Sequence, residues 1–362
     1  MSMRYQANIS SPGYNGLKVA NAPTIGTATS ASGTSASVTF TAPVCTGGGA
    51  ISGYTVFANC GIKTASGASS PLVVAGLTTG SPYTFKVFAT NSFGPSSASA
   101  ASNSVTPVVP AGQAAYTTSG TYSWVAPTGV ESVSVVAVGG GGVRGRWPAS
   151  CSYANGGGGG ALAYANNISV IPGNSYSVVV GAGDAYCGPG GSASTFNSTS
   201  VGAGGGQTNK SSNLGGAGGT VLYGTGGSGG NGGRDIGRAN ADPGNGGAGG
   251  YAGNGGNGAN AFAYNPTSGT GGGGGGGVGF CGGGTCPGGG GGVGILGQGA
   301  SGAGGTVPGQ RGGGGSGGVG GGITSEGGAY GGAGRVIAAS GAVRIIWPGT
   351  TRSFPSTNTG NL

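Results

Sequence analysis

Alternating apolar and polar positions predict short β-strands in the first third of the chain. Runs of this kind occupy residues 35–40 (SASVTF), 51–58 (ISGYTVFA) and 83–89 (YTFKVFA). Gly, Pro or Thr turns bound each run, which is typical of strands with one buried face. Short strands at this spacing predict a small β-sandwich that begins at Pro23 and ends near Pro107.

A second set of strands is expected from Tyr116 onward. The runs are residues 121–127, 131–142, 160–173 and 174–184, with a last run at 341–349. Between Val133 and Val138 both faces of the strand are largely apolar, which predicts burial on both sides. The simplest arrangement is a second β-sandwich whose early strands and last strand enclose a long insert.

The insert is dominated by glycine. The chain of 362 residues contains 98 glycines, and most of them lie between residues 139 and 334. In the stretch from 244 to 260, glycine occupies every third position at Gly244, Gly247, Gly250, Gly253 and Gly256. A polyproline II helix has three residues per turn and no internal hydrogen bonds, so it must bond to its neighbours, and glycine allows close approach. The frame of threes therefore predicts a bundle of short polyproline II-type rods.

Two other structures are compatible with so much glycine. A collagen-like triple helix also needs glycine at every third position, but here the frame breaks repeatedly and proline is sparse inside the triplets. Gly-rich segments of low complexity are also commonly disordered. The strands that bracket the insert, and the aromatic residues inside it, favour an ordered bundle.

Composition and charge exclude several classes of function. The chain has no histidine and only five acidic residues, so most acid/base catalysis and metal binding lack suitable side chains. We therefore expect no enzyme activity, no catalytic residue, no cofactor and no metal site. The net charge of +8 comes from scattered Lys and Arg, which does not indicate a nucleic-acid-binding surface. No apolar run reaches transmembrane length, so membrane insertion is not expected.

The stretch GLTTGSPYTFKVFATNSFGPSSAS resembles the second half of a fibronectin type III domain. Leu77 and Tyr83 stand where that family places its tyrosine corner, and Asn91 and Gly94 stand at its F–G turn. Phe40 departs from the family pattern, since many members have a core tryptophan there. The resemblance implies a β-sandwich that is more often a spacer than a binding module.

The rest of the chain resembles the Gly-rich domains of tailed-bacteriophage virion proteins. The resemblance is carried by YSWVAPTGVESVSVVAVGGGG, then ISVIPGNSYSVVVGAGD, then glycine runs, then GAVRIIWPGTTRSFPSTNT. The segment LKVANAPTIGTAT is similar to structural proteins of marine phages. Tail-fibre-tip adhesins of T-even-like phages are similar in having glycine rods that support variable loops, although they lack a fibronectin-like domain.

Together these features predict an all-β chain: a fibronectin type III-like β-sandwich followed by a β-sandwich frame that encloses a glycine-rich polyproline II-type bundle. The expected parts are a docking arm (1–22), the fibronectin-like domain (23–108), a linker (109–115), the glycine-rich domain (116–349) and a C-terminal tail (350–362).

The resemblance implies a fibre-like or adhesin-like component of a virion, assembled in the host cytoplasm and later exposed outside the cell. Its expected partners are other virion proteins, bound through the arm, and a host-surface glycan or outer-membrane protein, bound at the tip. A homotrimer would suit a fibre. The alternative is a decoration or scaffold protein that has no receptor.

If rods form the scaffold, recognition belongs to the loops between them. Arg, Tyr and Trp are the residue types that dominate binding hot spots. The expected receptor-binding residues are Arg144, Arg146, Trp147, Tyr153, Tyr186, Tyr264 and Phe280. The alternative is that these side chains cover rod ends or an oligomer interface.

Six cysteines form three pairs that are close in sequence, which suits an oxidising final environment. The expected disulfides are Cys45–Cys60, Cys151–Cys187 and Cys281–Cys286, and six free thiols are the alternative.

Two further motifs do not predict a catalytic or nucleotide-binding site. The carboxylates in RDIGRANAD (234–242) alternate with arginines, as in a surface ion-pair loop, and GGGQTNKS (204–211) lacks the glycine that precedes the lysine of a P-loop.

Overall fold

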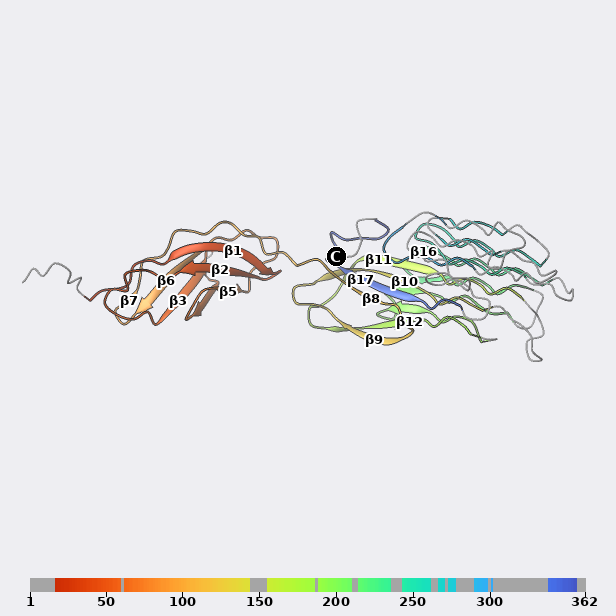
Figure 1. Ribbon diagram of the computed structural model, residues 1–362, viewed down its shortest axis with the longest axis horizontal. Helices are drawn as coiled ribbons and strands as arrows, with labels where there is room; N and C mark the ends of the chain where they lie inside the picture. The colour runs from red at the N-terminus through yellow and green to blue at the C-terminus, as the bar shows by residue number, and fades with distance from the viewer. Residues whose placement is uncertain are drawn as a thin grey trace, which may run out of the picture. The chain divides into compact units, whose positions relative to one another are not determined.

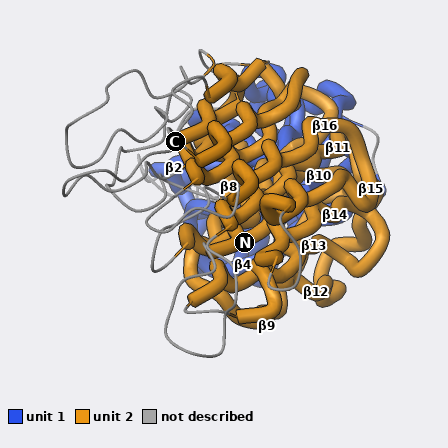
Figure 2. The backbone as a smooth tube through the Cα atoms, turned by 90° about the vertical axis from the view of Figure 1, so that its right-hand side faces the viewer, with its two compact units in different colours: residues 1–110 blue, residues 111–362 orange. Residues whose placement is uncertain are grey.

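The structure is a computed structural model that describes residues 17–59, 62–143, 155–185, 188–209, 214–235, 243–261, 266–270, 273–277, 290–298, 301 and 338–356. The chain divides into two compact units, Met1–Pro110 and Ala111–Leu362 (Figure 2). In the described residues every regular element is a β-strand, and all strand pairs are antiparallel. The all-β prediction is confirmed. This part of the chain holds no helix with the length and apolar character of a membrane span.

Unit 1 is a sandwich of two sheets (Figure 1). One sheet has the order β1 (Thr24–Ser32), β2 (Ser35–Thr41) and β5 (Leu72–Ala75). The other has the order β4 (Thr64–Gly67), β3 (Gly53–Ala58), β6 (Phe85–Asn91) and β7 (Gly94–Pro95). The alternating runs at 35–40, 51–58 and 83–89 coincide with β2, β3 and β6. Their inward side chains, among them Val38, Val56 and Val87, form the core.

Three details of unit 1 match the expectation from the fibronectin type III resemblance. The Tyr83 hydroxyl accepts a hydrogen bond from the backbone N–H of Thr78 at 3.1 Å, beside the buried Leu77. Asn91 ends β6, and its Oδ1 accepts from the N–H of Phe93 at 2.9 Å, which closes the turn into β7. Phe40 fills the core position that many members give to tryptophan, with its ring centroid 4.8 Å from that of Tyr54.

The described end of the expected docking arm and most of the expected linker belong to the folded units. Ala20 is buried in the core of unit 1, and Lys18 donates its N–H to the carbonyl of Gly47 at 3.0 Å. Residues 112–116 form strand β8, although most of them were expected in a linker, because they complete a sheet edge beside β17 (Ala342–Trp347).

Unit 2 contains the expected sandwich frame, built from two five-stranded sheets. One has the order β16 (Thr225–Gly227), β11 (Leu162–Ser169), β10 (Ser132–Val138), β17 and β8 (Gly112–Tyr116). The other has the order β15 (Val221–Tyr223), β14 (Val201–Ala203), β13 (Ser194–Phe196), β12 (Ser175–Val180) and β9 (Gly120–Val125). The ring centroids of Trp124 on β9 and Trp347 on β17 lie 5.7 Å apart, so the two sheets pack face to face.

Strand β10 is buried on both faces, as its sequence predicts. From Val133 to Val138 every residue is fully buried, including Ser134. Val136 and Val138 belong to a cluster with Tyr251 and Phe354. Because Tyr251 comes from the glycine-rich segments, these segments cover the outer face of this sheet.

The glycine-rich segments run from the strands of the frame toward one end of unit 2 and back (Figure 1). They contain no helix and almost no strand pairing of their own. We call these segments rods, and they are residues 139–143, 155–161, 181–185, 188–193, 204–209, 214–220, 227–235, 243–250, 252–261, 266–270, 273–277, 290–297 and 338–341.

Rod 243–250 illustrates how the rods are held together. Gly244, Gly247 and Gly250 donate their N–H groups to carbonyls of rod 252–261, at 2.8 Å each. Gly246 and Gly249 donate to rod 155–161 at 2.9 Å, and Ala248 donates to Gly291 at 2.9 Å. Successive residues thus bond to three different neighbours, as three residues per turn requires. In the described part of the insert, the expected lateral bonding of glycine rods is confirmed.

Glycine is required because the rods approach closely. A Cβ atom on Gly159 would lie less than 3.0 Å from the carbonyl oxygen of Gly247, and one on Gly247 would lie equally close to that of Gly274. These obstacles are backbone atoms of other rods, so no rotamer change would relieve the overlap. The rod packing itself therefore excludes larger residues at these positions.

Candidate functional site

The topology gathers most connections between rods at one end of the bundle. Rod 139–143 leaves the frame after β10, rod 155–161 returns to β11, and the later rods alternate in the same way. We call the far end of the bundle the loop end. The described residues that flank its connections are Val143, Asn155, Ala185, Gly188, Asn209, Leu214, Asp235, Pro243, Ala261, Pro266, Gly277 and Gly290.

Hydrogen bonds show that these flanking residues lie next to one another. The N–H of Val143 donates to Thr208 Oγ1 at 3.1 Å. The N–H of Asp235 donates to Asn155 Oδ1 at 3.0 Å. Residues 65 and 80 positions apart in sequence are thus brought together at the loop end.

A buried carboxylate fixes part of the loop end. Asp184 is 6% exposed, and its Oδ2 accepts hydrogen bonds from Thr208 Oγ1 at 2.6 Å and from the N–H of Gly190 at 3.0 Å. Its Oδ1 accepts from the N–H of Ala185 at 2.9 Å. With three donors directed at it, Asp184 ties three rods together and has a structural role.

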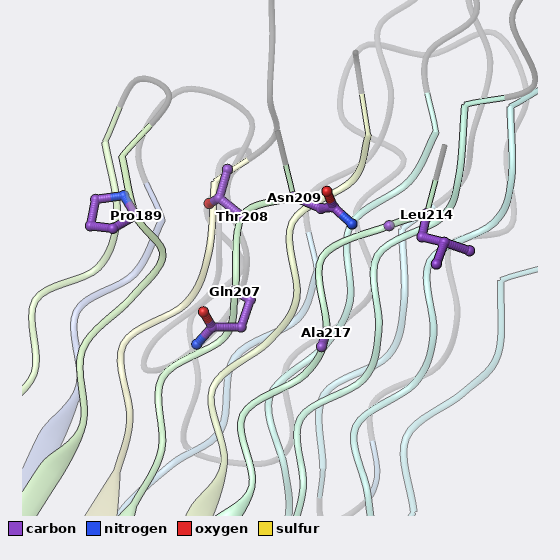
Figure 3. A pocket seen from close by; sticks show the side chains of 7 residues that line it. Pro189, Gln207, Thr208, Asn209, Leu214 and Ala217 are labelled. Atoms are coloured by element: carbon purple, nitrogen blue, oxygen red, sulfur yellow. The ribbon is translucent and has the colours of Figure 1, made fainter. Parts of the chain in front are cut away.

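A shallow pocket of about 490 Å³ lies beside this carboxylate. Figure 3 shows its side chains on neighbouring rods, with the amide of Asn209 near Leu214 and with Gln207 between Asn209 and Pro189. The remaining lining residues are Thr208, Gly215 and Ala217. Amide groups beside apolar surface suit a neutral ligand with hydroxyl groups, such as a sugar ring. The described residues contain no cluster of His, Cys, Asp and Glu that could hold a metal ion.

The receptor-binding residues expected from the sequence all lie outside the described residues: Arg144, Arg146, Trp147, Tyr153, Tyr186, Tyr264 and Phe280. The residues that flank them in sequence do lie at the loop end. Of the six cysteines only Cys45 is described, and it forms no disulfide with another described residue. The three expected disulfides and the seven expected contacts therefore stay predictions.

The sequence reading missed the pocket residues. Gln207, Thr208 and Asn209 lie in the segment GGGQTNKS, whose partial likeness to a P-loop does not predict a pocket. The sequence feature that could have identified these residues is a run of polar side chains that interrupts a glycine rod. In a bundle with small, buried residues along each rod, such a run marks the place where a rod ends.

Comparison with protein families gives two matches. Residues 117–340, more than half of the chain, match the family described as glycine-rich domain. Residues 21–105 match the fibronectin type III domain. No curated protein matches the chain.

Two solved structures show partial similarity. One is titin kinase and its flanking domains, with 26% identity, a TM-score of 0.22, and coverage of 25% of this chain and 17% of that chain. The other is the chitinase ChiA74 from Bacillus thuringiensis, with 13% identity, a TM-score of 0.20, and coverage of 55% of this chain and 28% of that chain. This chain thus spans less than a third of either structure.

Proposed function

The chain belongs to the glycine-rich domain family, and we propose that it is a non-enzymatic structural component of a phage particle that contributes to host-surface attachment through its loop end. The fibronectin type III domain and the glycine-rich domain indicate a structural or binding role. The virion setting rests on the sequence resemblance to phage fibre and tip proteins. A tail, neck or head fibre is the kind of particle component that we propose.

One observation carries the attachment role. Six connections that differ in length and sequence begin and end at the same end of a bonded rod bundle, between residues such as Val143 and Asn155, or Ala261 and Pro266. Recognition loops are commonly held in this way, because a rigid scaffold fixes their positions while their sequences vary. The pocket beside Gln207 and Asn209 would add a site for a neutral sugar at the same end.

The remaining parts have roles that follow from this arrangement. The arm at residues 1–22 would bind other virion proteins, and the fibronectin type III domain would act as a spacer. The loop end would face a host glycan or an outer-membrane protein. Three copies of the chain would suit a fibre.

The test is whether the purified chain binds intact host cells and competes with adsorption of the phage. We expect saturable binding, and we expect Trp147→Ala to reduce it without lowering the melting temperature. Tyr223→Ala is the matched control, because Tyr223 is an aromatic residue, 44% exposed, on strand β15 of the frame.

Two results would count against this proposal. If the virion contains the protein but the purified chain neither binds cells nor competes with adsorption, the chain is a decoration or scaffold protein. If Trp147→Ala and Tyr223→Ala bind equally well, the contact does not include Trp147.

A further inference from the structure

Four neighbouring rods of the bundle form a solvent-facing layer along its side. These are rods 214–220, 227–235, 252–261 and 266–270, and each is hydrogen-bonded to the next, for example from Gly229 N–H to the Gly219 carbonyl at 2.9 Å. On each rod about one residue in three is exposed. The exposed residues with side chains are Leu214, Ala217, Thr220, Asn231, Arg234, Ala252, Asn254, Asn257, Asn260, Thr267, Ser268 and Thr270.

Three of these side chains form a regular ladder of amides. The Oδ1 atoms of Asn254, Asn257 and Asn260 accept hydrogen bonds from three successive exposed-face N–H groups of rod 227–235, at 3.0, 2.8 and 3.0 Å. A fourth amide on the adjacent rod, Asn231, accepts from the N–H of Gly218 at 2.9 Å. The backbone thus fixes the orientation of every amide in the layer.

The opposite side of each amide is free to bind a ligand. None of the Nδ2 groups of Asn254, Asn257 and Asn260 donates a hydrogen bond to another described residue, and all three side chains are exposed. An amide NH₂ group has two donor hydrogens. Rod 252–261 therefore presents a row of oriented donors, one for every three residues, or about 9 Å apart along a polyproline II helix.

Apart from Arg234, whose N–H donates to Asn260, the exposed side chains around the ladder are uncharged. Arg234, at the loop end, is the one charged residue among the exposed side chains of the four described rods. The hydroxyls of Thr267 and Thr270 flank the amides, and the N–H groups of Asn257 and Asn254 donate to their Oγ1 atoms at 2.7 and 2.9 Å. A ligand for this surface should be neutral and extended, with acceptor oxygens repeated at a matching interval.

We propose that the side of the rod bundle along Asn254, Asn257 and Asn260 binds an extended, uncharged polysaccharide chain that lies parallel to the rods. Its hydroxyl, ring or carbonyl oxygens accept hydrogen bonds from the Nδ2 donors. A linear glycan whose repeat matches this interval would place equivalent oxygens opposite successive amides. The pocket at the loop end is lined by rod 214–220 of the same layer but by no residue of rod 252–261, so this site does not depend on the attachment proposed there.

A purely structural role for the asparagines would involve only their Oδ1 atoms, which bond to rod 227–235. Substitution with aspartate separates the two roles, because a carboxylate oxygen still accepts from the backbone N–H while the outward donor is lost. Substitution with alanine removes both, at positions where water can reach the freed N–H groups. The two triple variants therefore test the outward donors independently of rod packing.

The experiment measures co-sedimentation of the intact chain with particles of cellulose, chitin and β-mannan. We expect saturable binding to at least one of them that persists in about 0.5 M NaCl, because the contact is uncharged. The triple variants N254D/N257D/N260D and N254A/N257A/N260A should each bind at least about tenfold more weakly. The control N59A/N174A removes exposed amides outside the four rods and should bind like the wild type.

Three outcomes would overturn the proposal. One is no binding to any of the three polysaccharides. Another is wild-type binding by either triple variant with a melting temperature like that of the unaltered chain. The third is concentration-dependent self-association in sedimentation velocity that is lost in the triple variants, without polysaccharide binding, which would assign the ladder to a second copy of the chain.

Discussion

At the scale of single residues, many glycines of the bundle are required because backbone atoms of a neighbouring rod occupy the space that a Cβ atom would need. Gly247 donates its N–H to the Gly256 carbonyl and accepts from the N–H of Gly230, and a Cβ atom on it would overlap the Gly274 carbonyl. We expect Gly247→Val to destabilise unit 2 by more than about 3 kcal/mol, because two backbones would have to separate. Thermal unfolding followed by circular dichroism measures the effect.

Ala252→Val is the matched control for this prediction. Ala252 lies at the bend that begins the next rod, five residues away, and is exposed. Its replacement should change stability by less than about 0.5 kcal/mol. Equal melting temperatures for the two valine variants would mean that the rods are not packed through Gly247.

The buried phenol of Tyr251 should make the stability of unit 2 depend on pH in the alkaline range. Burial raises the pKa of its phenol above the ordinary value of 10.0, and its oxygen accepts a hydrogen bond from the N–H of Gly297 at 3.2 Å. The folded state therefore holds this proton more tightly than the unfolded state does. The associated stability is complete below pH 10 and is lost as the pH rises through the folded-state pKa.

We expect the free energy of unfolding of unit 2, measured by denaturant titration, to fall progressively as the pH rises above about 10. Tyr251→Phe should cost about 0.5–1.5 kcal/mol at neutral pH, because the hydrogen bond is lost, but its alkaline decrease should be smaller. If the variant and the unaltered chain lost stability equally, other groups would be responsible.

At the scale of elements, the segment after β17 holds the rods against the frame. Phe354 is 2% exposed, and its ring stacks on that of Tyr251 with centroids 5.8 Å apart. Its backbone N–H donates to Asn166 Oδ1 at 2.8 Å, and Asn166 Nδ2 donates to its carbonyl at 2.6 Å. This segment was expected to be a tail, but it completes the core beneath the turn at Tyr251.

We therefore expect Phe354→Ala to destabilise unit 2 by about 3–5 kcal/mol, as large-to-small changes of buried aromatics do. Limited proteolysis should then cut the rod segments faster than in the unaltered chain. Thr351→Ala, at an exposed position three residues earlier, is the control and should not alter either measurement. Unchanged proteolysis of the Phe354 variant would contradict a role for this residue in anchoring the rods.

The buried Arg344 is a second link between a strand and a rod. It is 1% exposed on β17, and its Nη1 donates to the Ile295 carbonyl at 3.1 Å, while Nη2 donates to the Gln113 side chain. Burial lowers the pKa of the guanidinium, and Arg352 adds to this effect. The charged group thus joins β17, β8 and rod 290–297 beneath Tyr251.

Several elements could be predicted from the sequence because their pattern is local. Strands β2, β6 and β10 have alternating or continuous apolar residues, and the frame of threes around Gly247 identified rods. Strands β13 and β16 have three residues each, too few for a period to be recognised. The pairing between rods was also unpredictable, because one glycine rod can bond to another with little dependence on sequence.

The sequence predicted that the candidate site would lie in loops between rods, but it did not predict which described residues would form it. Loops between rods were expected to carry recognition, and their flanking residues do converge at one end of unit 2. The pocket and the amide ladder were not foreseen, since Gln207 and Asn257 acquire their neighbours only from the order in which rods pack. The ladder depends on Asn257 meeting Asn231, which is 26 positions away in sequence.

At the scale of the whole molecule, the two units have separate cores. The core of unit 1 is built around Val38, Phe85 and Val87, whereas that of unit 2 includes Val136, Tyr251 and Ile346. The two family matches, at 21–105 and 117–340, fall in different units. Each unit thus has the buried apolar cluster that an independently folding domain needs.

We expect fragments 1–110 and 111–362 each to fold alone and to unfold cooperatively at the temperatures of the corresponding transitions of the intact chain. Calorimetry of the two fragments and of the full chain measures this. Gly247→Val in the intact chain should move only the transition of unit 2, and a core change such as Val87→Ala should move only that of unit 1, because the two residues lie in different cores. If one substitution shifted both transitions, the stability of one unit would depend on the other. The two units would then not be independent domains, which would contradict a separate spacer role for unit 1.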